Sequence, residues 1–346
     1  MKKDILYLLL IMGMLLAACS GGSVKAISEP TKAPAAGQPA ASVEATSAEA
    51  ASTPLAETMN AGAESPGAND LSSLAKILGN LSYAGVFPDQ QITLKDGYFA
   101  YSEGGGGTPH VSLVDRLILT GDLNADEAQD AIFLLEDDSE GSGRLTFLVG
   151  VLNVFTDPQP VEAAILGGRS GVKSLAIDGS QVTADIVTHG PGDPDCCASW
   201  NVQVVYSLEE GRLVEKSRTE RKQISLDDLD GTQWRLVALG ADQQASLPEN
   251  GITLQFDNGQ ISGFAGCNDY TSAVSSGDYG RNSIKVDSII TTTQKSCSGP
   301  VASQEKSFLE ALANASAWVY EYGDLALIFG VGDDQVEKLL FEPIDQ

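Results

Sequence analysis

Most of the chain consists of short apolar segments of strand length, separated by turn dipeptides that end in glycine. Asp178-Gly179 and Glu210-Gly211 each lie between two segments of alternating apolar and polar residues. Such a dipeptide favours the tight turn of a β-hairpin, and the alternation gives each strand one side that faces a core. Further hairpins are predicted to turn at Asp96-Gly97 and Gly323-Asp324, and a further strand is predicted over 283–292. The chain is therefore predicted to be predominantly antiparallel β-sheet.

Two segments have the three- and four-residue spacing of an amphipathic helix. The first has apolar residues at Leu71, Leu74, Ile77, Leu78 and Leu81. The second, 300–315, begins at a proline and places Phe308, Leu309 and Leu312 on one face. Helices that do not alternate with the strands indicate an α+β fold rather than a parallel α/β fold.

The N-terminus has the pattern of an export signal. Two lysines precede an apolar run that is short for a membrane span, and two alanines precede Cys19. The sequence LAAC resembles the bacterial lipobox, which implies a lipoprotein signal peptide at 1–18 and lipidation of Cys19. The alternative is an uncleaved membrane anchor. Both place the remaining chain outside the cytoplasm, and acyl chains on Cys19 would hold it at the extracytoplasmic face of the cell membrane.

Residues 19–70 are almost entirely Ala, Ser, Pro, Glu, Gly and Thr. A segment of this composition cannot bury enough apolar surface to offset the loss of chain entropy on folding. We therefore predict a disordered linker that separates the folded part from the lipid anchor.

The residues after the linker are too numerous for one typical core, which predicts two β-rich domains at 71–222 and 226–344. The boundary is placed at a cluster of charges with little apolar periodicity. The formal net charge of −26 argues against a nucleic-acid partner, because nucleic-acid binders need a basic face. It also argues against direct adhesion to anionic lipid, so the predicted membrane partner is reached through the lipid anchor.

Five motifs follow one another in the C-terminal segment 226–344: LDGTQWRL (229–236), SGFAGCNDYTSAV (262–274), ITTTQKSC (290–297), QEKSFLEAL (304–312) and GDLALIF (323–329). With these motifs the segment resembles the META/HslJ-like domain family. The family is known from extracytoplasmic bacterial proteins and has no established catalytic mechanism. The resemblance therefore implies a fold more than an activity.

Cys267 and Cys297 are expected to form a disulfide. After Cys19, four cysteines remain, and an even number in an oxidising compartment favours disulfides. A catalytic Cys267 would need a histidine base, but His110 and His189 both lie in the other predicted domain. The glycines around Cys267 would permit a tight bend, and Asn268 would tolerate a left-handed turn.

Cys196 and Cys197 are adjacent, so a disulfide between them would be strained. Three states remain open: a vicinal disulfide, two free thiols, or a metal site together with His189, Asp193 and Asp195.

A calcium loop is a second possibility for metal binding. Asp122, Asn124, Asp126 and Asp130 occupy loop positions 1, 3, 5 and 9, as oxygen ligands of calcium do. Glu127 stands where a glycine is usual, and Phe133 stands where a bidentate Glu is usual. The alternative is a solvated acidic turn between two strands.

These features predict a non-enzymatic, lipid-anchored protein that binds an unknown protein or ligand, or that supports the envelope under stress. One alternative is a protease inhibitor or small-ligand-binding module, which an apolar cleft or an exposed aromatic patch would favour. Another is a hydrolase that uses two carboxylates, with Asp193 and Asp195 as the nearest candidates in sequence.

Overall fold

The computed structural model describes residues 68–101, 109–138, 144–193, 198–240, 251–278, 280–331 and 336–344. The predicted signal peptide, Cys19 and the linker up to residue 67 lie outside these ranges. Within them, no helix combines the length and the apolar character needed to cross a membrane. The described part is mostly antiparallel β-sheet with two short α-helices, as the sequence predicted.

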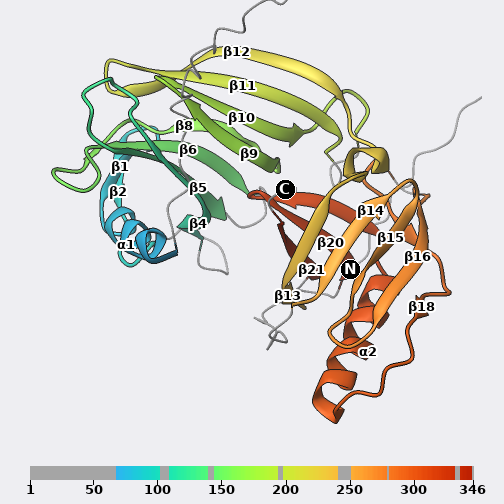
Figure 1. Ribbon diagram of the computed structural model, residues 1–346. Coiled ribbons are helices and arrows are strands. Elements are labelled where there is room, and N and C mark those ends of the chain that lie inside the picture. Colours follow the sequence, from blue (N-terminus) through green and yellow to red (C-terminus); the bar gives the residue numbers. More distant parts are fainter. Residues whose placement is uncertain are drawn as a thin grey trace, which may run out of the picture. The chain divides into compact units, whose positions relative to one another are not determined.

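A six-stranded antiparallel sheet lies at the centre of the region 71–222 (Figure 1). Its strands are β3 (Tyr98–Ala100), β4 (His110–Gly121), β5 (Asp130–Asp138), β6 (Leu145–Leu152), β7 (Gln159–Pro160) and β8 (Ala164–Gly168). In β5, Ile132 and Leu134 face one apolar cluster, while Phe133 and Leu135 face another. Because successive side chains of a strand point to opposite faces, burial of both faces explains why this segment is almost continuously apolar.

A four-stranded sheet packs on one face of this central sheet. Its strands are β9 (Gly171–Asp178), β10 (Gln181–Thr188), β11 (Trp200–Glu209) and β12 (Arg212–Gln223). Val182 and Val204 are fully buried in the same cluster as Ile132 and Leu134. The two predicted hairpin turns lie in this sheet and are confirmed, with β9 paired to β10 and β11 paired to β12.

Helix α1 and a two-stranded hairpin cover the opposite face of the central sheet. The elements are α1 (Ala68–Leu78), β1 (Ser82–Phe87) and β2 (Gln90–Thr93). Leu74, Leu78 and Tyr83 are fully buried against Phe133. The Tyr83 hydroxyl donates a hydrogen bond to the Leu78 carbonyl oxygen at 2.6 Å, which ties the hairpin to the end of the helix. The first predicted helix is therefore confirmed.

The C-terminal region forms one antiparallel sheet that curls into a half-barrel (Figure 1). Its strands are β13 (Gln233–Leu239), β14 (Thr253–Asp257), β15 (Gln260–Phe264), β16 (Asp269–Ser275), β17 (Lys285–Val286), β18 (Thr291–Thr292), β19 (Ala317–Glu321), β20 (Asp324–Val331) and β21 (Val336–Pro343). A short 3₁₀ helix, η1 (Leu226–Leu229), precedes β13. Neighbours in the sheet follow the order β17-β16-β15-β14-β13-β21-β20-β19, and β18 pairs with β16.

Helix α2 (Gly299–Ala313) packs against this curled sheet. Phe308 and Leu312 are fully buried, as the helical spacing predicted. The Phe308 ring packs edge-on against Tyr270, with ring centroids 5.6 Å apart, and against Phe341 at 6.4 Å. Such aromatic contacts add to the stabilisation from burial alone.

Three sequence predictions are corrected in detail. The last hairpin turns at Tyr322-Gly323, with φ of 54° and 90°, because Asp324 already belongs to β20. The Asp96-Gly97 turn forms, but β2 pairs with β1 and β3 pairs with β4, so the strands on either side belong to different sheets. The predicted strand over 283–292 is reduced to β17 and β18, because Asp287 accepts a hydrogen bond from the Ile289 amide and so makes a turn between them.

Contacts join the region 71–222 to the C-terminal sheet. Val187 and Ile224 are buried in the same apolar cluster as the C-terminal core. The Gly323 amide donates to the Val172 carbonyl at 3.0 Å, where β9 and β19 approach each other. Asp324 forms an ion pair with Arg116, which links β20 to β4. The division into domains 71–222 and 226–344 stays a prediction.

Asp324 predicts a pH dependence of stability. Burial raises its pKa to about 6, although the Arg116 guanidinium opposes the rise. A carboxyl whose pKa is higher in the folded state favours folding when protonated, so this contribution is full below pH 4 and is lost as pH rises through 6. The loss amounts to about 3 kcal/mol. We expect the Asp324→Asn substitution to remove this pH dependence. Urea unfolding at several pH values between 4 and 7 would measure the free energy of unfolding of both proteins.

The matched control is Asp257→Asn, which removes an exposed carboxyl group from the same domain. If the stability of the Asp324→Asn variant depends on pH in the same way as that of wild type, Asp324 is not the cause of the dependence.

Candidate functional site

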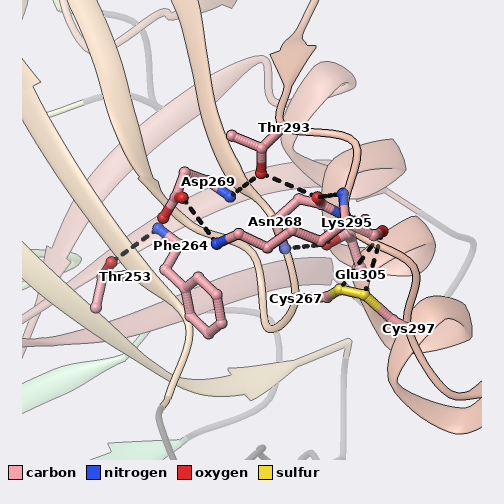
Figure 2. Close-up of polar contacts among 9 residues, drawn as sticks. All are labelled: Thr253, Phe264, Cys267, Asn268, Asp269, Thr293, Lys295, Cys297 and Glu305. Carbon is pink, nitrogen blue, oxygen red and sulfur yellow. Dashed lines mark hydrogen bonds and ion pairs between the residues drawn. A yellow bond between two sulfur atoms is a disulfide. The ribbon is translucent and has the colours of Figure 1, made fainter.

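The conspicuous motif GFAGCNDY, residues 263–270, connects β15 to β16 and faces the start of α2 (Figure 2). Cys267 forms a disulfide with Cys297, which lies 30 residues later, and their Cα atoms are 6.3 Å apart. The predicted pairing is therefore present in the structure. A disulfide sulfur cannot act as a thiolate nucleophile or metal ligand, so Cys267 has a structural role in this state.

The two glycines of the motif are required for different reasons. Gly266 has φ of 102°, which allows the bend that the sequence predicted at the end of the strand. Gly263 lies inside β15 instead, and a Cβ atom there would lie 2.1 Å from the Thr253 carbonyl oxygen. That oxygen also accepts a hydrogen bond from the Tyr270 hydroxyl at 2.9 Å. Gly263 is thus needed for close approach of two backbone segments.

Asn268 is the centre of a buried hydrogen-bond network, whereas the sequence suggested a left-handed turn residue. The φ angle of Asn268 is not positive, so Asn268 is not a left-handed turn residue and that suggestion is wrong. Its Nδ2 donates to both carboxylate oxygens of Glu305, at 2.9 and 3.2 Å, and its amide N donates at 2.7 Å. Its Oδ1 accepts from Thr293 Oγ1 at 2.9 Å and from the Lys295 amide at 2.8 Å.

An exposed ion pair lies beside this network (Figure 2). Lys295 Nζ is 3.2 Å from Asp269 Oδ2, and both side chains are largely exposed. Exposed pairs of this kind stabilise by less than about 1 kcal/mol, so the buried Asn268 contacts dominate. Together, the disulfide and the Asn268 network fasten the β15–β16 connection to α2 and to the segment before it. Each hydrogen-bonding group of the Asn268 side chain is used in this structural task.

Asn268→Asp is expected to lower the free energy of unfolding by about 3 kcal/mol. The substitution keeps the shape of the side chain but replaces the donor to Glu305 with a second carboxylate. Both lost hydrogen bonds end on a charged acceptor, and two carboxylates would then repel each other at close range. Urea unfolding at pH 7 measures the loss, and it should shrink near pH 4 because one carboxyl group can then take up a proton.

Gln260→Glu is the control for this experiment, because Gln260 is an exposed amide in the adjacent strand β15. We expect a change within about 0.5 kcal/mol for that variant. Equal effects of the two substitutions would show that added negative charge, and not the Glu305 contact, is responsible.

The proposed calcium ligands lie between β4 and β5, and their carboxylates accept hydrogen bonds from nearby backbone amides. Asp122 accepts from the amides of Asp126 and Glu127, and Asp126 accepts from the Ala128 amide at 2.8 Å. Asn124 donates to Asp126 at 2.9 Å. Asp130 is fully buried and accepts from the amides of Leu123 and Asn153, at 2.7 and 2.9 Å. These bonds favour an acidic turn that is held by its own backbone.

Thermal melting can test whether Asp122, Asn124, Asp126 and Asp130 bind calcium. In the part of the chain that the structure describes, no three His, Cys, Asp or Glu side chains are grouped to hold a metal ion. Since amide donors already occupy the carboxylate oxygens, we expect the same melting temperature in millimolar calcium as in chelator. A calcium-specific increase, which magnesium does not reproduce, would instead establish the site.

The segment HGPGDPDCC is described in part. Cys196, Cys197 and Asp195 lie outside the described residues. Asp193 accepts hydrogen bonds from the Gly190 amide at 3.0 Å, and from the Ser199 amide and hydroxyl at 2.9 and 2.7 Å. Burial opposes ionisation, but these bonds and nearby His189 lower the pKa of Asp193. A carboxyl with a lowered pKa is suited to fixing a loop and poorly suited to donating a proton as a general acid.

A cavity of about 210 Å³ lies where β9 and β19 approach each other. Its apolar wall includes Val172, Val187, Ile224 and Trp318. Sequence reasoning missed this cavity, because its residues come from segments more than 100 positions apart and share no short motif. An apolar cavity is the feature that favours a small-ligand-binding module.

The comparisons with known proteins support the C-terminal resemblance and add nothing to the first region. No curated protein and no solved structure matches the chain. The family model for the META domain matches residues 227–341, which contain the disulfide, the Asn268 network and the curled sheet described above. This C-terminal part of the chain is therefore a META domain.

Proposed function

We propose that the protein is a non-enzymatic binding protein that is held at the extracytoplasmic face of the cell membrane by lipid on Cys19. The best support for this proposal is that the residues of the META-domain motif hold the domain together and are not free for catalysis. Cys267 is in a disulfide, and the Asn268 side chain is fully engaged with Glu305 and the segment before α2. The motif thus acts to build a rigid domain, which suits a protein that presents a binding surface.

The anchor is supported by the sequence alone. The LAAC sequence ends at Cys19, and the Ala/Ser/Pro-rich composition of 19–70 suits a tether of some length. The net charge of −26 disfavours direct adhesion to anionic lipid, so a covalent lipid would supply the attachment.

The test is metabolic labelling with a fatty-acid probe, followed by fractionation of the cells. We expect label on the wild-type protein and its recovery with membranes, whereas Cys19→Ala should lack label. Crosslinking in intact cells with both proteins then compares their neighbours. Turnover in a substrate screen, with no envelope partner crosslinked, would contradict the non-enzymatic proposal.

A small-ligand-binding role is a second candidate, and the cavity between β9 and β19 is the observation that favours it. The hydrolase alternative has less support, because Asp193 is engaged in three hydrogen bonds that fix its own loop.

A further inference from the structure

A second pocket, which we call the Lys173 pocket, lies where β9 meets the META domain. Its volume is about 280 Å³, and its wall includes Lys173, Trp234, Tyr320 and Pro343. It shares only Tyr320 with the cavity between β9 and β19. An apolar cavity of roughly 150 Å³ admits benzene, so the Lys173 pocket has room for one ring with a short polar substituent.

Two polar side chains in the wall of the Lys173 pocket already have partners within the protein. Trp234 Nε1 donates a hydrogen bond to Thr232 Oγ1 at 2.7 Å, so the indole presents only its apolar surface. The Asp228 carboxylate forms an ion pair with Lys222 through Oδ1, and its Oδ2 accepts from the Ser225 amide at 2.9 Å. The negative charge of Asp228 is therefore compensated from outside the pocket.

Lys173 is the other charged group in the wall, and it has no carboxylate partner. No ion pair among the described residues includes it. Its side chain is partly buried, and its Nζ lies 5.2 Å from the centroid of the Tyr320 ring. An aromatic face attracts an ammonium group but does not neutralise its charge. Because the chain has 47 acidic residues against 21 lysines and arginines, an uncompensated cation beside an apolar wall favours an anionic ligand.

We propose that the Lys173 pocket binds a small organic anion with a compact apolar body. The anionic group accepts a hydrogen bond from the Lys173 ammonium, and the apolar body packs against Trp234 and Pro343. The proposal goes beyond the membrane-anchored role, since the pocket does not depend on lipid. The unlipidated Cys19→Ala variant should therefore bind with the same affinity, and failure of either proposal leaves the other intact.

The first test locates the ligand in the full chain with the probe 4-bromophenylacetate. Bromine quenches tryptophan fluorescence at short range, so we expect saturable quenching that phenylacetate reverses. Trp234→Phe should remove most of the quenching, whereas Trp200→Phe and Trp318→Phe should retain it. Loss of quenching in Trp318→Phe alone would place the probe in the cavity between β9 and β19 and overturn the proposal. Quenching that does not saturate would also overturn it.

The second test asks by calorimetry whether the Lys173 charge selects the ligand. We expect Lys173→Gln to weaken phenylacetate binding about tenfold, and Lys173→Arg to retain most of the affinity because it keeps the charge. Neutral phenylacetamide should bind wild type about as weakly as phenylacetate binds Lys173→Gln.

The matched control is Lys285→Gln, which removes an exposed lysine of β17 that forms no ion pair and does not line the pocket. Its affinity for phenylacetate should equal that of wild type. Wild-type affinity in Lys173→Gln would contradict the proposed site. Equal losses in Lys173→Gln and Lys285→Gln would also contradict it, because net charge alone would then explain the effect. Urea unfolding of both variants checks that they are folded.

Discussion

Gly263→Ala is expected to destabilise the protein by about 3 kcal/mol or more. The added Cβ would lie 2.1 Å from the carbonyl oxygen of Thr253 and 2.7 Å from its carbonyl carbon. Both are backbone atoms of β14, so no side-chain rotation relieves the clash. The strands β14 and β15 would have to separate, which would also disturb the hydrogen bond from Tyr270 to Thr253.

Urea unfolding of Gly263→Ala measures this loss, and Gly299→Ala is the matched control. Gly299 begins helix α2 and has open space where a Cβ would lie. Alanine is the better helix former, so we expect the control to be neutral or slightly stabilising. A Gly263→Ala variant within about 1 kcal/mol of wild type would show that the backbone approach at Thr253 is not tight.

The Cys267–Cys297 disulfide is expected to contribute about 3 to 4 kcal/mol, because it closes a loop of 30 residues in the unfolded chain. The double variant Cys267→Ser/Cys297→Ser should lose this amount in urea unfolding. Wild-type protein treated with a reductant should then match the variant, and the reductant should leave the variant unchanged.

Two results would argue against a structural bridge. One is alkylation of Cys267 or Cys297 in oxidised protein without denaturant, which would show free thiols. The other is equal stability of the oxidised and reduced proteins. In that case the Asn268 network, which joins the same loop to α2 through Glu305, would be enough to hold the motif.

The local elements could be predicted because their signals lie within a few residues. The turns at Gly179 and Gly211 have positive φ of 55° and 78°, a conformation that glycine adopts without steric cost. The apolar spacing of Leu74 and Leu78 placed α1 correctly, since both residues lie on the buried face of one helix. The last hairpin was predicted one residue too late, because Tyr322 adopts a left-handed conformation that is uncommon for such a residue.

The pairing of strands into sheets was harder to predict from the sequence. The segment over 283–292 has a strand-like apolar pattern, but the Asp287 carboxylate makes a local turn and leaves Ile289 exposed. The strands on either side of Asp96-Gly97 join different sheets, because tertiary partners compete with the local hairpin. A pattern within one strand does not indicate which neighbour will complete its hydrogen bonds.

At the candidate site, the sequence was enough to predict the disulfide of Cys267 but not the contacts around it. Cysteine count and the predicted extracytoplasmic location favour a bridge, because thiols in an oxidising compartment tend to form disulfides. The Asn268–Glu305 contact joins residues 37 positions apart, and asparagine and glutamate are too common for their pairing to be inferred from composition. Of the motif glycines, Gly266 fits a bend that a sequence can suggest, but the need for Gly263 comes from Thr253 in the adjacent strand.

The sequence by itself determined that the chain is an antiparallel β protein and that its C-terminal part is a META domain, and it favoured the Cys267–Cys297 bridge that the structure contains. These properties depend on backbone periodicity, turn residues and a bond type with few possible partners. The tertiary structure decided what the motif does and which distant side chains meet. Asn268 finds Glu305, Asp324 finds Arg116, and Asn282 meets the wall of a cavity. Each of these contacts depends on how segments that are distant in the sequence approach one another and become buried, which no local sequence pattern encodes.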